Sequence, residues 1–336
     1  MIAGAPEEAR WVRPEPRSVP TAVALQRLVG TAFPRRHVVA IDPLAGGFRN
    51  ANFKVQLDGA REWIVLRIYE HDASLCQKEV DLIRLIGGSV PVANVIHAEP
   101  AGWDDFPPFA LIRHVEGITF HELKRLANRD AIAQAAYSVG QTLAAIGRFT
   151  FVKSGWLAPG PTVAAPLLEG ANPTPRFVDL CLESPNLRVR MPADLRDRTH
   201  AMVWSAAAML AELDRQACLV HGDFGKRNLL MRENIGRWSV AAVLDWEFAI
   251  SSSPLTDLGH FLRYEGTTHP LAEPHFSEGY VNAGGTLPQE WRRIARLVDM
   301  TALCESLTHD QLPHTVVAEL LELVRATVED RDPVLP

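Results

Sequence analysis

One short segment of the chain combines two carboxylates and an amide in a pattern suited to metal-dependent chemistry. It reads HGDFGKRNLL from His221 and is followed by VLDWEFA. Asp223 and Asn228 flank a tight loop between apolar runs, and Asp245 ends the next run. Phosphoryl transfer needs a carboxylate beside the acceptor hydroxyl and oxygen ligands for magnesium. This spacing places the carboxylate and the magnesium ligands on one predicted hairpin.

These motifs resemble the catalytic and metal-binding motifs of the aminoglycoside phosphotransferase and choline kinase superfamily, whose fold is related to that of the protein kinases. The resemblance implies ATP and Mg²⁺ as cofactors. It also implies that Asp223 is the catalytic base, which orients the substrate hydroxyl and accepts its proton. Asn228 and Asp245 would hold the magnesium ion.

Three further residues are expected to support the catalytic loop. By the resemblance, His221 braces it through hydrogen bonds, and Asp257 in the segment PLTDL is assigned a supporting role. Lys226 is also expected to support the loop. Lys226 and Arg227 lie inside it, where cations could also screen the charge of the transferring phosphoryl group.

The amino-terminal part resembles the nucleotide-binding half of the same superfamily. The segment LAGGFRNANF has glycines that would let backbone N–H groups approach phosphate oxygens. The segment WIVLRIY resembles the strand that carries the phosphate-binding cation. Here that cation is Arg67, whereas protein kinases have lysine. A helical glutamate would pair with it, and FALIRHVEG would form the hinge whose backbone reads adenine. The nucleotide-binding candidates are Gly46, Gly47, Asn50, Arg67, Glu79, Arg113, His114 and Val115.

The elements around these motifs change character along the chain. Apolar residues at helical spacing predict helices over 21–32 and 75–86, and runs rich in β-branched and aromatic residues predict strands. The strands are expected over 38–44, 53–57, 63–69, 92–98 and 109–115, and later over 218–221, 229–232 and 240–245. Asp58-Gly59 predicts a hairpin turn. Further helices are expected over 130–149, 193–216, 255–263, 288–307 and 315–328, whereas the proline- and glycine-rich stretch 150–192 is predicted to be a loop region.

This order predicts an α+β, bilobal, protein-kinase-like fold. Residues 1–20 would form a flexible arm, and residues 21–115 an amino-terminal lobe with an antiparallel sheet and one inserted helix. Residues 116–336 would form a larger, mostly helical lobe that carries the catalytic loop and binds the acceptor.

Composition narrows the class of partner. The chain has 336 residues and a formal net charge of −6, which argues against nucleic-acid binding. The four cysteines form no CxxC pair, and no apolar run suggests a signal peptide or a membrane span. We therefore expect a cytoplasmic monomer or homodimer.

The acceptor is less well defined than the reaction. From His221 to the end, the chain has 17 acidic and 10 basic residues, a balance that favours a cationic acceptor. Possible contributors are Glu247, Glu265, Glu273 and Glu278. An aminoglycoside or another amine-bearing antibiotic is the first hypothesis. Alternatives are a metabolic kinase for choline, homoserine, a fructosamine or a sugar, a macrolide kinase, and a nucleotide-binding pseudokinase.

Overall fold

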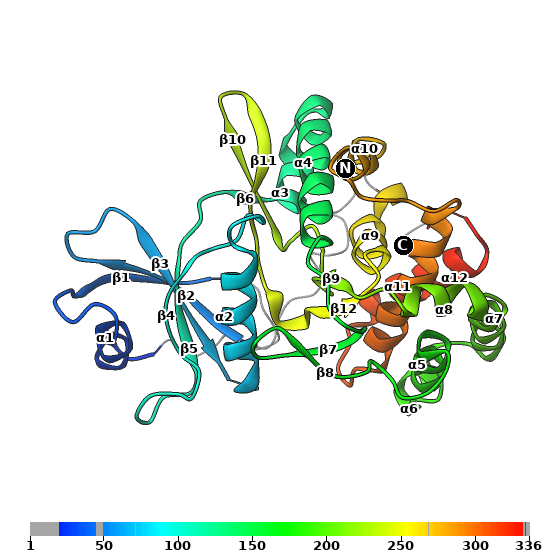
Figure 1. Cartoon of the computed structure of the whole chain (residues 1–336), viewed down its shortest axis with the longest axis horizontal. Helices are drawn as coiled ribbons and strands as arrows, with labels where there is room; N and C mark the ends of the chain where they lie inside the picture. The colour runs from blue at the N-terminus through cyan, green and yellow to red at the C-terminus, as the bar shows by residue number, and fades with distance from the viewer. Residues whose placement is uncertain (1–19, 45–49, 71, 268, 332, 334–336) are drawn as a thin grey trace.

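A computed structural model describes residues 20–331, except 45–49, 71 and 268, together with residue 333. The predicted flexible arm therefore lies almost wholly outside the described residues. Figure 1 shows a sheet-rich lobe at one end of the molecule and a helix-rich lobe at the other. The expected α+β architecture with two lobes is confirmed.

The amino-terminal lobe is one antiparallel sheet of five strands in the order β1-β2-β3-β5-β4. Its elements are α1 (Ala22–Gly30), β1 (Val38–Pro43), β2 (Asn50–Leu57), β3 (Trp63–Tyr69), α2 (Ser74–Ile86), β4 (Val95–Glu99) and β5 (Phe109–Arg113). The turn at Asp58-Gly59 does connect two paired strands, because Gln56 of β2 lies opposite Trp63 of β3. In Figure 1, α2 lies on the side of the sheet that faces the other lobe.

The carboxyl-terminal lobe begins with the short strand β6 and contains two small sheets among its helices. Its first elements are β6 (Ile118–Thr119), α3 (Phe120–Leu126), α4 (Arg129–Ile146), β7 (Gly155–Ala158), β8 (Thr162–Ala165), α5 (Pro173–Leu182), α6 (Pro185–Arg190), α7 (Ala193–Ser205) and α8 (Ala207–Asp214). These are followed by β9 (Cys218–Val220), β10 (Leu229–Asn234), β11 (Arg237–Val243), η2 (Trp246–Phe248), β12 (Ile250–Ser252), α9 (Leu255–Leu262), η3 (Glu265–Thr267), α10 (His275–Asn282), α11 (Trp291–Thr308) and α12 (His314–Val328). The sheet orders are β11-β10-β6 and β8-β7-β12-β9.

The prediction of a loop region over 150–192 is wrong. This stretch holds the β7–β8 hairpin and the helices α5 and α6. Pro173 and Pro185, which resemble turn signals in the sequence, each stand in the first turn of a helix, where proline needs no N–H partner. The single helix expected over 193–216 is also divided, because Ala206 leaves helical geometry at ψ 6° between α7 and α8.

Two glycines bring helices α4 and α10 into backbone contact. A Cβ atom at Gly140 would lie 2.0 Å from the carbonyl oxygen of Phe276. A Cβ atom at Gly279 would lie 2.1 Å from the carbonyl oxygen of Tyr137. The missing side chains therefore set the distance between the two helices. In the described part of the chain, no helix has the length and apolar character needed to cross a membrane.

Candidate active site

The catalytic-loop motif connects β9 to β10. Asn228 Nδ2 donates to both the Asp223 backbone carbonyl and Asp223 Oδ2, each at 2.9 Å, so the two ends of the loop are tied together. Gly222 has φ +80°, and a Cβ atom there would lie 2.4 Å from the Phe248 carbonyl oxygen. Only glycine suits this turn, which places Asp223 beside Asn228.

Two buried side chains hold the start of this loop. The Asp257 carboxylate accepts hydrogen bonds from the backbone N–H groups of His221 at 2.7 Å and Gly222 at 3.0 Å. His221 Nδ1 accepts from the Asp223 N–H at 3.2 Å, and its Nε2 lies 2.8 Å from the Leu244 carbonyl oxygen. Burial raises the pKa of the Asp257 carboxyl, and the two backbone hydrogen bonds act in the opposite direction. These contacts match the supporting positions that the sequence suggested.

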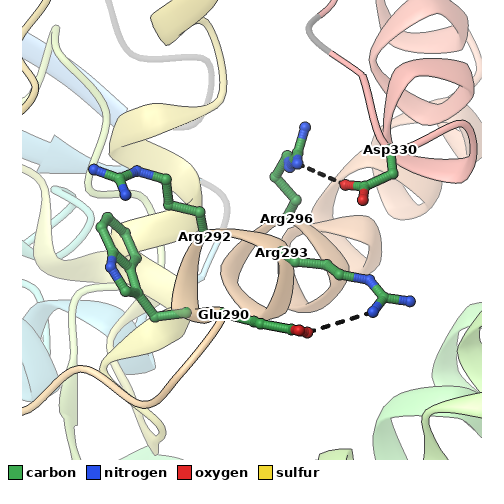
Figure 2. Close-up of a pocket in the computed structure, with 6 residues that line it drawn as sticks. Glu290, Arg292, Arg293, Arg296 and Asp330 are labelled. Carbon is green, nitrogen blue, oxygen red and sulfur yellow. Dashed lines mark hydrogen bonds and ion pairs between the residues drawn. The ribbon is translucent and has the colours of Figure 1, made fainter.

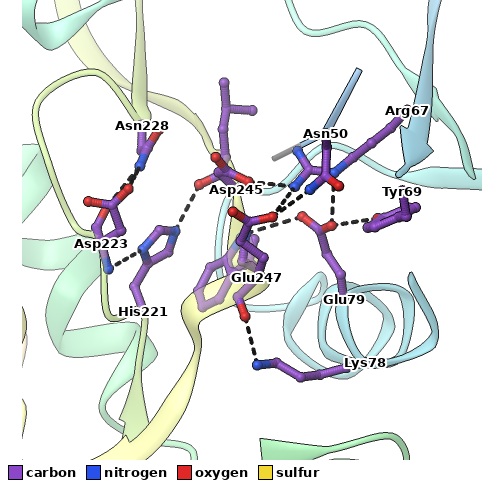
Figure 3. Close-up of polar contacts among 12 residues, drawn as sticks. Asn50, Arg67, Tyr69, Lys78, Glu79, His221, Asp223, Asn228, Asp245 and Glu247 are labelled. Atoms are coloured by element: carbon purple, nitrogen blue, oxygen red, sulfur yellow. Dashed lines mark hydrogen bonds and ion pairs between the residues drawn. The ribbon is translucent and has the colours of Figure 1, made fainter. Parts of the chain in front are cut away.

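Asp245 reaches the same place from the end of β11. The Leu244 N–H donates to the Asn228 carbonyl at 2.8 Å, which brings the two motifs together. Asp245 itself adopts φ +65° and ψ +65°, a left-handed conformation that costs free energy for a residue with a side chain. Such strain is concentrated at functional sites, and here it directs the carboxylate toward Arg67 (Figure 3).

Arg67 on β3 lies among three carboxylates. Its Nε is 3.0 Å from Glu79 Oε2 of α2, and its NH2 is 2.5 Å from Asp245 Oδ1 and 3.5 Å from Glu247 Oε2. The expected pair between Arg67 and Glu79 is therefore present. Burial lowers the pKa of the guanidinium, but Glu79 and Asp245 outweigh burial and raise it above its ordinary value.

Glu247 and its neighbours connect the two lobes. Its Oε2 accepts from Asn50 Nδ2 of β2 at 2.5 Å, and its backbone carbonyl accepts from Lys78 Nζ of α2 at 2.7 Å. Glu79 makes a second link, because its Oε1 accepts the Trp246 N–H at 3.1 Å. Figure 3 shows these side chains converging from β2, β3 and α2 on the segment after β11.

The hinge candidates lie at the end of β5 and just after it. The Arg113 N–H donates to the Asn94 carbonyl at 2.8 Å, and the His114 N–H donates to the Trp63 carbonyl at 3.1 Å. Two of the three backbone N–H groups therefore already have partners within the amino-terminal lobe, which makes the Val115 N–H the better candidate for reading adenine. Gly46 and Gly47 lie outside the described residues.

Lys226 is directed away from the reacting groups. Its Nζ donates to the Phe261 carbonyl of α9 at 2.8 Å, and the residue is only 4% exposed. This contact supports the loop from beneath and does not favour phosphoryl screening by Lys226. Arg227, the next residue, is exposed and faces His121 Nε2 at 3.5 Å. It is the better candidate for the screening role.

The four acidic residues proposed for acceptor binding do not form one surface. Glu247 belongs to the lobe junction, and Glu265 lies 3.6 Å from Lys124 and accepts the Ala272 and Glu273 N–H groups. Glu273 caps α10 by accepting the Ser277 N–H at 3.0 Å and pairs with Arg292. Glu278 is exposed beside His275.

A separate pocket of about 400 Å³ lies at the start of α11, lined by Glu290, Trp291, Arg292, Arg293, Arg296 and Asp330 (Figure 2). Its arginines are already paired: Arg293 with Glu290 at 3.5 Å and Arg296 with Asp330 at 2.8 Å. Arg292 pairs with Glu273. The pocket contains no catalytic-loop residue.

One contact of the catalytic loop was not found from the sequence. His260 Nε2 of α9 lies 3.1 Å from Asp223 Oδ1. Burial raises the pKa of the Asp223 carboxyl, but the hydrogen bond from His260, with His221 and Arg263 nearby, holds it below its ordinary value. The available signal was spacing: His260 stands three residues after Asp257 and so shares its helix face.

The donor set suits magnesium. No group of three or more His, Cys, Asp or Glu side chains among the described residues could hold a metal by itself. Magnesium, however, usually takes one or two protein oxygens and completes its shell with water and phosphate. The Asp245 carboxylate could supply one such oxygen. Because the Asn228 amide nitrogen bonds to Asp223, its carbonyl oxygen could supply the other.

Two curated proteins match short parts of the chain. Acyl-CoA dehydrogenase family member 11 of Mus musculus is 47% identical over 82 residues, which are 24% of this chain and 9% of the mouse protein. The Rattus norvegicus protein of the same name is 45% identical over 51 residues, which are 15% of this chain and 6% of the rat protein. The chain spans less than a tenth of the length of these relatives.

Solved structures match almost the whole chain. Aminoglycoside phosphotransferase APH(4)-Ia has a TM-score of 0.66 and 17% identity, over 92% of this chain and 99% of that chain. The GDP and kanamycin complex of APH(2")-IIIa has a TM-score of 0.66 and 19% identity, over 91% of this chain and 98% of that chain. These values show a shared fold.

The family is identified by a sequence model. The model described as the phosphotransferase enzyme family matches residues 40–297. That match extends from β1, through the Arg67 cluster and the catalytic loop, into α11. The chain belongs to the phosphotransferase enzyme family.

Proposed function

We propose that this chain transfers the γ-phosphate of ATP to a hydroxyl group of a small molecule. The observation that supports this most is the convergence of Asp223, Asn228 and Asp245 from two adjoining strand ends, next to the Arg67–Glu79 pair. This is the set of base, magnesium ligands and phosphate-binding cation that phosphoryl transfer uses.

Each residue has a stated part in the mechanism. Asp223 accepts a hydrogen bond from the acceptor hydroxyl, aligns its oxygen and takes its proton as the new phosphorus–oxygen bond forms and the bond from the γ-phosphorus to the oxygen of the leaving ADP breaks. Asn228 and Asp245 would hold magnesium, Arg67 would bind phosphate oxygens, and the Val115 N–H would read adenine. Magnesium, when bound, would supply positive charge that neutralises the phosphate oxygens.

The first acceptor class remains an amine-bearing, hydroxylated small molecule such as an aminoglycoside. It is supported by the fold neighbours, among them complexes with hygromycin B and kanamycin. Glu247, Glu265, Glu273 and Glu278 already have partners within the protein and give it no added support.

A second acceptor class comes from the curated relatives. A mouse protein named for acyl-CoA is 47% identical over 82 residues of this chain, whereas the aminoglycoside enzymes are 17–20% identical over about nine-tenths of it. The second candidate acceptor is therefore a hydroxylated acyl thioester.

The test is a panel of acceptors incubated with Mg-ATP and analysed by mass spectrometry for a phosphorylated product. The panel contains aminoglycosides, macrolides, choline, homoserine, fructosamines, sugars and hydroxyacyl thioesters. The active acceptor is then tested with Asp223→Asn, which should lower kcat by about two to four orders of magnitude with ATP affinity preserved. A pseudokinase would bind ATP, transfer no phosphate to any acceptor and be indifferent to this substitution.

A further inference from the structure

The mechanism above leaves one close neighbour of the catalytic base without a role. His260 Nε2 lies 3.1 Å from Asp223 Oδ1, and Asn228 Nδ2 donates to Asp223 Oδ2 at 2.9 Å. Each oxygen of this carboxylate therefore has a fixed partner on a different element. The carboxylate cannot rotate about its Cβ–Cγ bond without breaking both contacts.

A second contact selects the tautomer of the imidazole. Arg263 NH2 lies 3.5 Å from His260 Nδ1, and a guanidinium group can only donate. Nδ1 is therefore the nitrogen that accepts, and Nε2 carries the hydrogen directed at Asp223. The other tautomer would set an N–H against the guanidinium and a lone pair against the carboxylate.

Arg263 is itself fixed from the interior. Its Nε lies 2.8 Å from Asp299 Oδ2 and its NH2 lies 2.7 Å from Asp299 Oδ1 of α11, a bidentate pair. The exposed fractions of the side chains rise from 5% at Asp299 and 11% at Arg263 to 16% at His260 and 37% at Asp223. A chain of contacts thus runs from the buried face of α11 to the reactive carboxylate.

We propose that His260 is a positioning residue for Asp223, held by Arg263 in the Nε2–H tautomer so that the carboxylate keeps a fixed orientation toward the acceptor hydroxyl. The inference rests on the proposed phosphotransferase function. It assigns His260 no contact with the acceptor or the phosphoryl group.

The experiment compares the full-length wild type with three variants, using the acceptor found in the panel. His260→Gln keeps a donor close to the Nε2 position, so kcat should stay within about five-fold of wild type. His260→Ala should lower kcat by about ten- to one hundred-fold, with KM for ATP within two-fold. His200→Ala is the matched control, because His200 forms a similar pair with Asp179 at 2.7 Å on α7 and α5.

A readout without turnover follows the tautomer directly. In protein labelled with ¹⁵N-histidine, the resonances lost in His260→Gln should report a protonated Nε2 and an unprotonated Nδ1 at pH 8. The positioning role is overturned if His260→Ala retains wild-type kcat, if His260→Gln loses as much kcat as His260→Ala, or if the Nδ1–H tautomer is found. A wild type that phosphorylates no acceptor overturns the proposed function itself, and the positioning role with it.

Discussion

Arg67 and Asp245, which are 178 residues apart in the sequence, are joined by a hydrogen bond of 2.5 Å between the two lobes. The cation expected to bind phosphate and the carboxylate expected to bind magnesium are thus partners of each other. Glu79 and Glu247 also lie within 3.5 Å of Arg67, so its guanidinium faces three carboxylates. This cluster contributes to the stability of the lobe junction, and under the proposed function it would also bind the nucleotide.

Arg67→Ala should therefore have two effects. It removes the guanidinium from beside the buried carboxylates of Glu79 and Glu247, so the free energy of unfolding should fall by about 3 kcal/mol, and the affinity for Mg-ATP should fall as well. Arg67→Lys keeps the charge but not the forked geometry, and should lose less of both. Chemical denaturation measures the free energy of unfolding, and calorimetric titration measures the affinity for Mg-ATP.

The control is Arg293→Ala, whose pair with Glu290 is more than 60% exposed and should contribute less than about 1 kcal/mol. Arg67→Ala with wild-type stability would contradict the burial argument.

Asp245→Asn tests the metal assignment without disturbing the backbone. Asparagine tolerates the left-handed conformation at φ +65°, which alanine would not. The substitution removes the negative charge that magnesium requires, so the gain in ATP affinity on adding magnesium should be largely lost. ATP titrations with magnesium and with a chelator measure that gain. A variant with the same magnesium dependence as wild type would exclude Asp245 as a ligand.

Gly140→Ala should separate α4 from α10. The added Cβ atom would meet the Phe276 carbonyl oxygen at 2.0 Å, and a backbone atom cannot move aside cheaply. We expect a loss of about 2 kcal/mol in the free energy of unfolding, measured by urea denaturation. Gly88→Ala is the control, because nothing lies within 4 Å of its added Cβ atom and its stability should change by less than about 0.5 kcal/mol. Equal effects of the two substitutions would refute the close helix contact.

Asp214 should make stability depend on pH. It is the last residue of α8; burial raises the pKa of its carboxyl, and the hydrogen bond from the Thr174 hydroxyl at 2.6 Å only partly opposes this. A raised folded-state pKa means that the contribution of this group to stability is present below the unfolded pKa and is lost as pH rises through the folded one.

Asp214→Asn keeps an acceptor for Thr174 and removes the charge, so Tm should rise by about 1–3 °C at pH 8. The gain should shrink toward pH 4, where Asp214 is increasingly protonated. Thermal melting across this range gives the comparison, and a gain that grows as the pH falls would reverse the assigned sign.

Local signals in the sequence were enough for much of the fold. Asp58-Gly59 predicted the β2–β3 hairpin, and the apolar spacing of residues 75–86 predicted α2. Proline was the main source of error. Pro173 and Pro185 read as breaks in structure, whereas each begins a helix, and sequence alone does not separate these two uses of a residue with fixed φ.

The sequence by itself determined the candidate site: the residue types and spacing of Asp223, Asn228 and Asp245 form the motif that resembles the phosphotransferase motifs, because loop geometry between adjoining strands is a local property. The tertiary structure decided which side chains meet. Glu247 faces Arg67, Lys226 ties the catalytic loop to α9, and His260 reaches Asp223. Such contacts depend on how separate elements pack against one another. The pattern of apolar residues indicates whether a segment is a helix or a strand, but it does not indicate which side chains of another element it will contact.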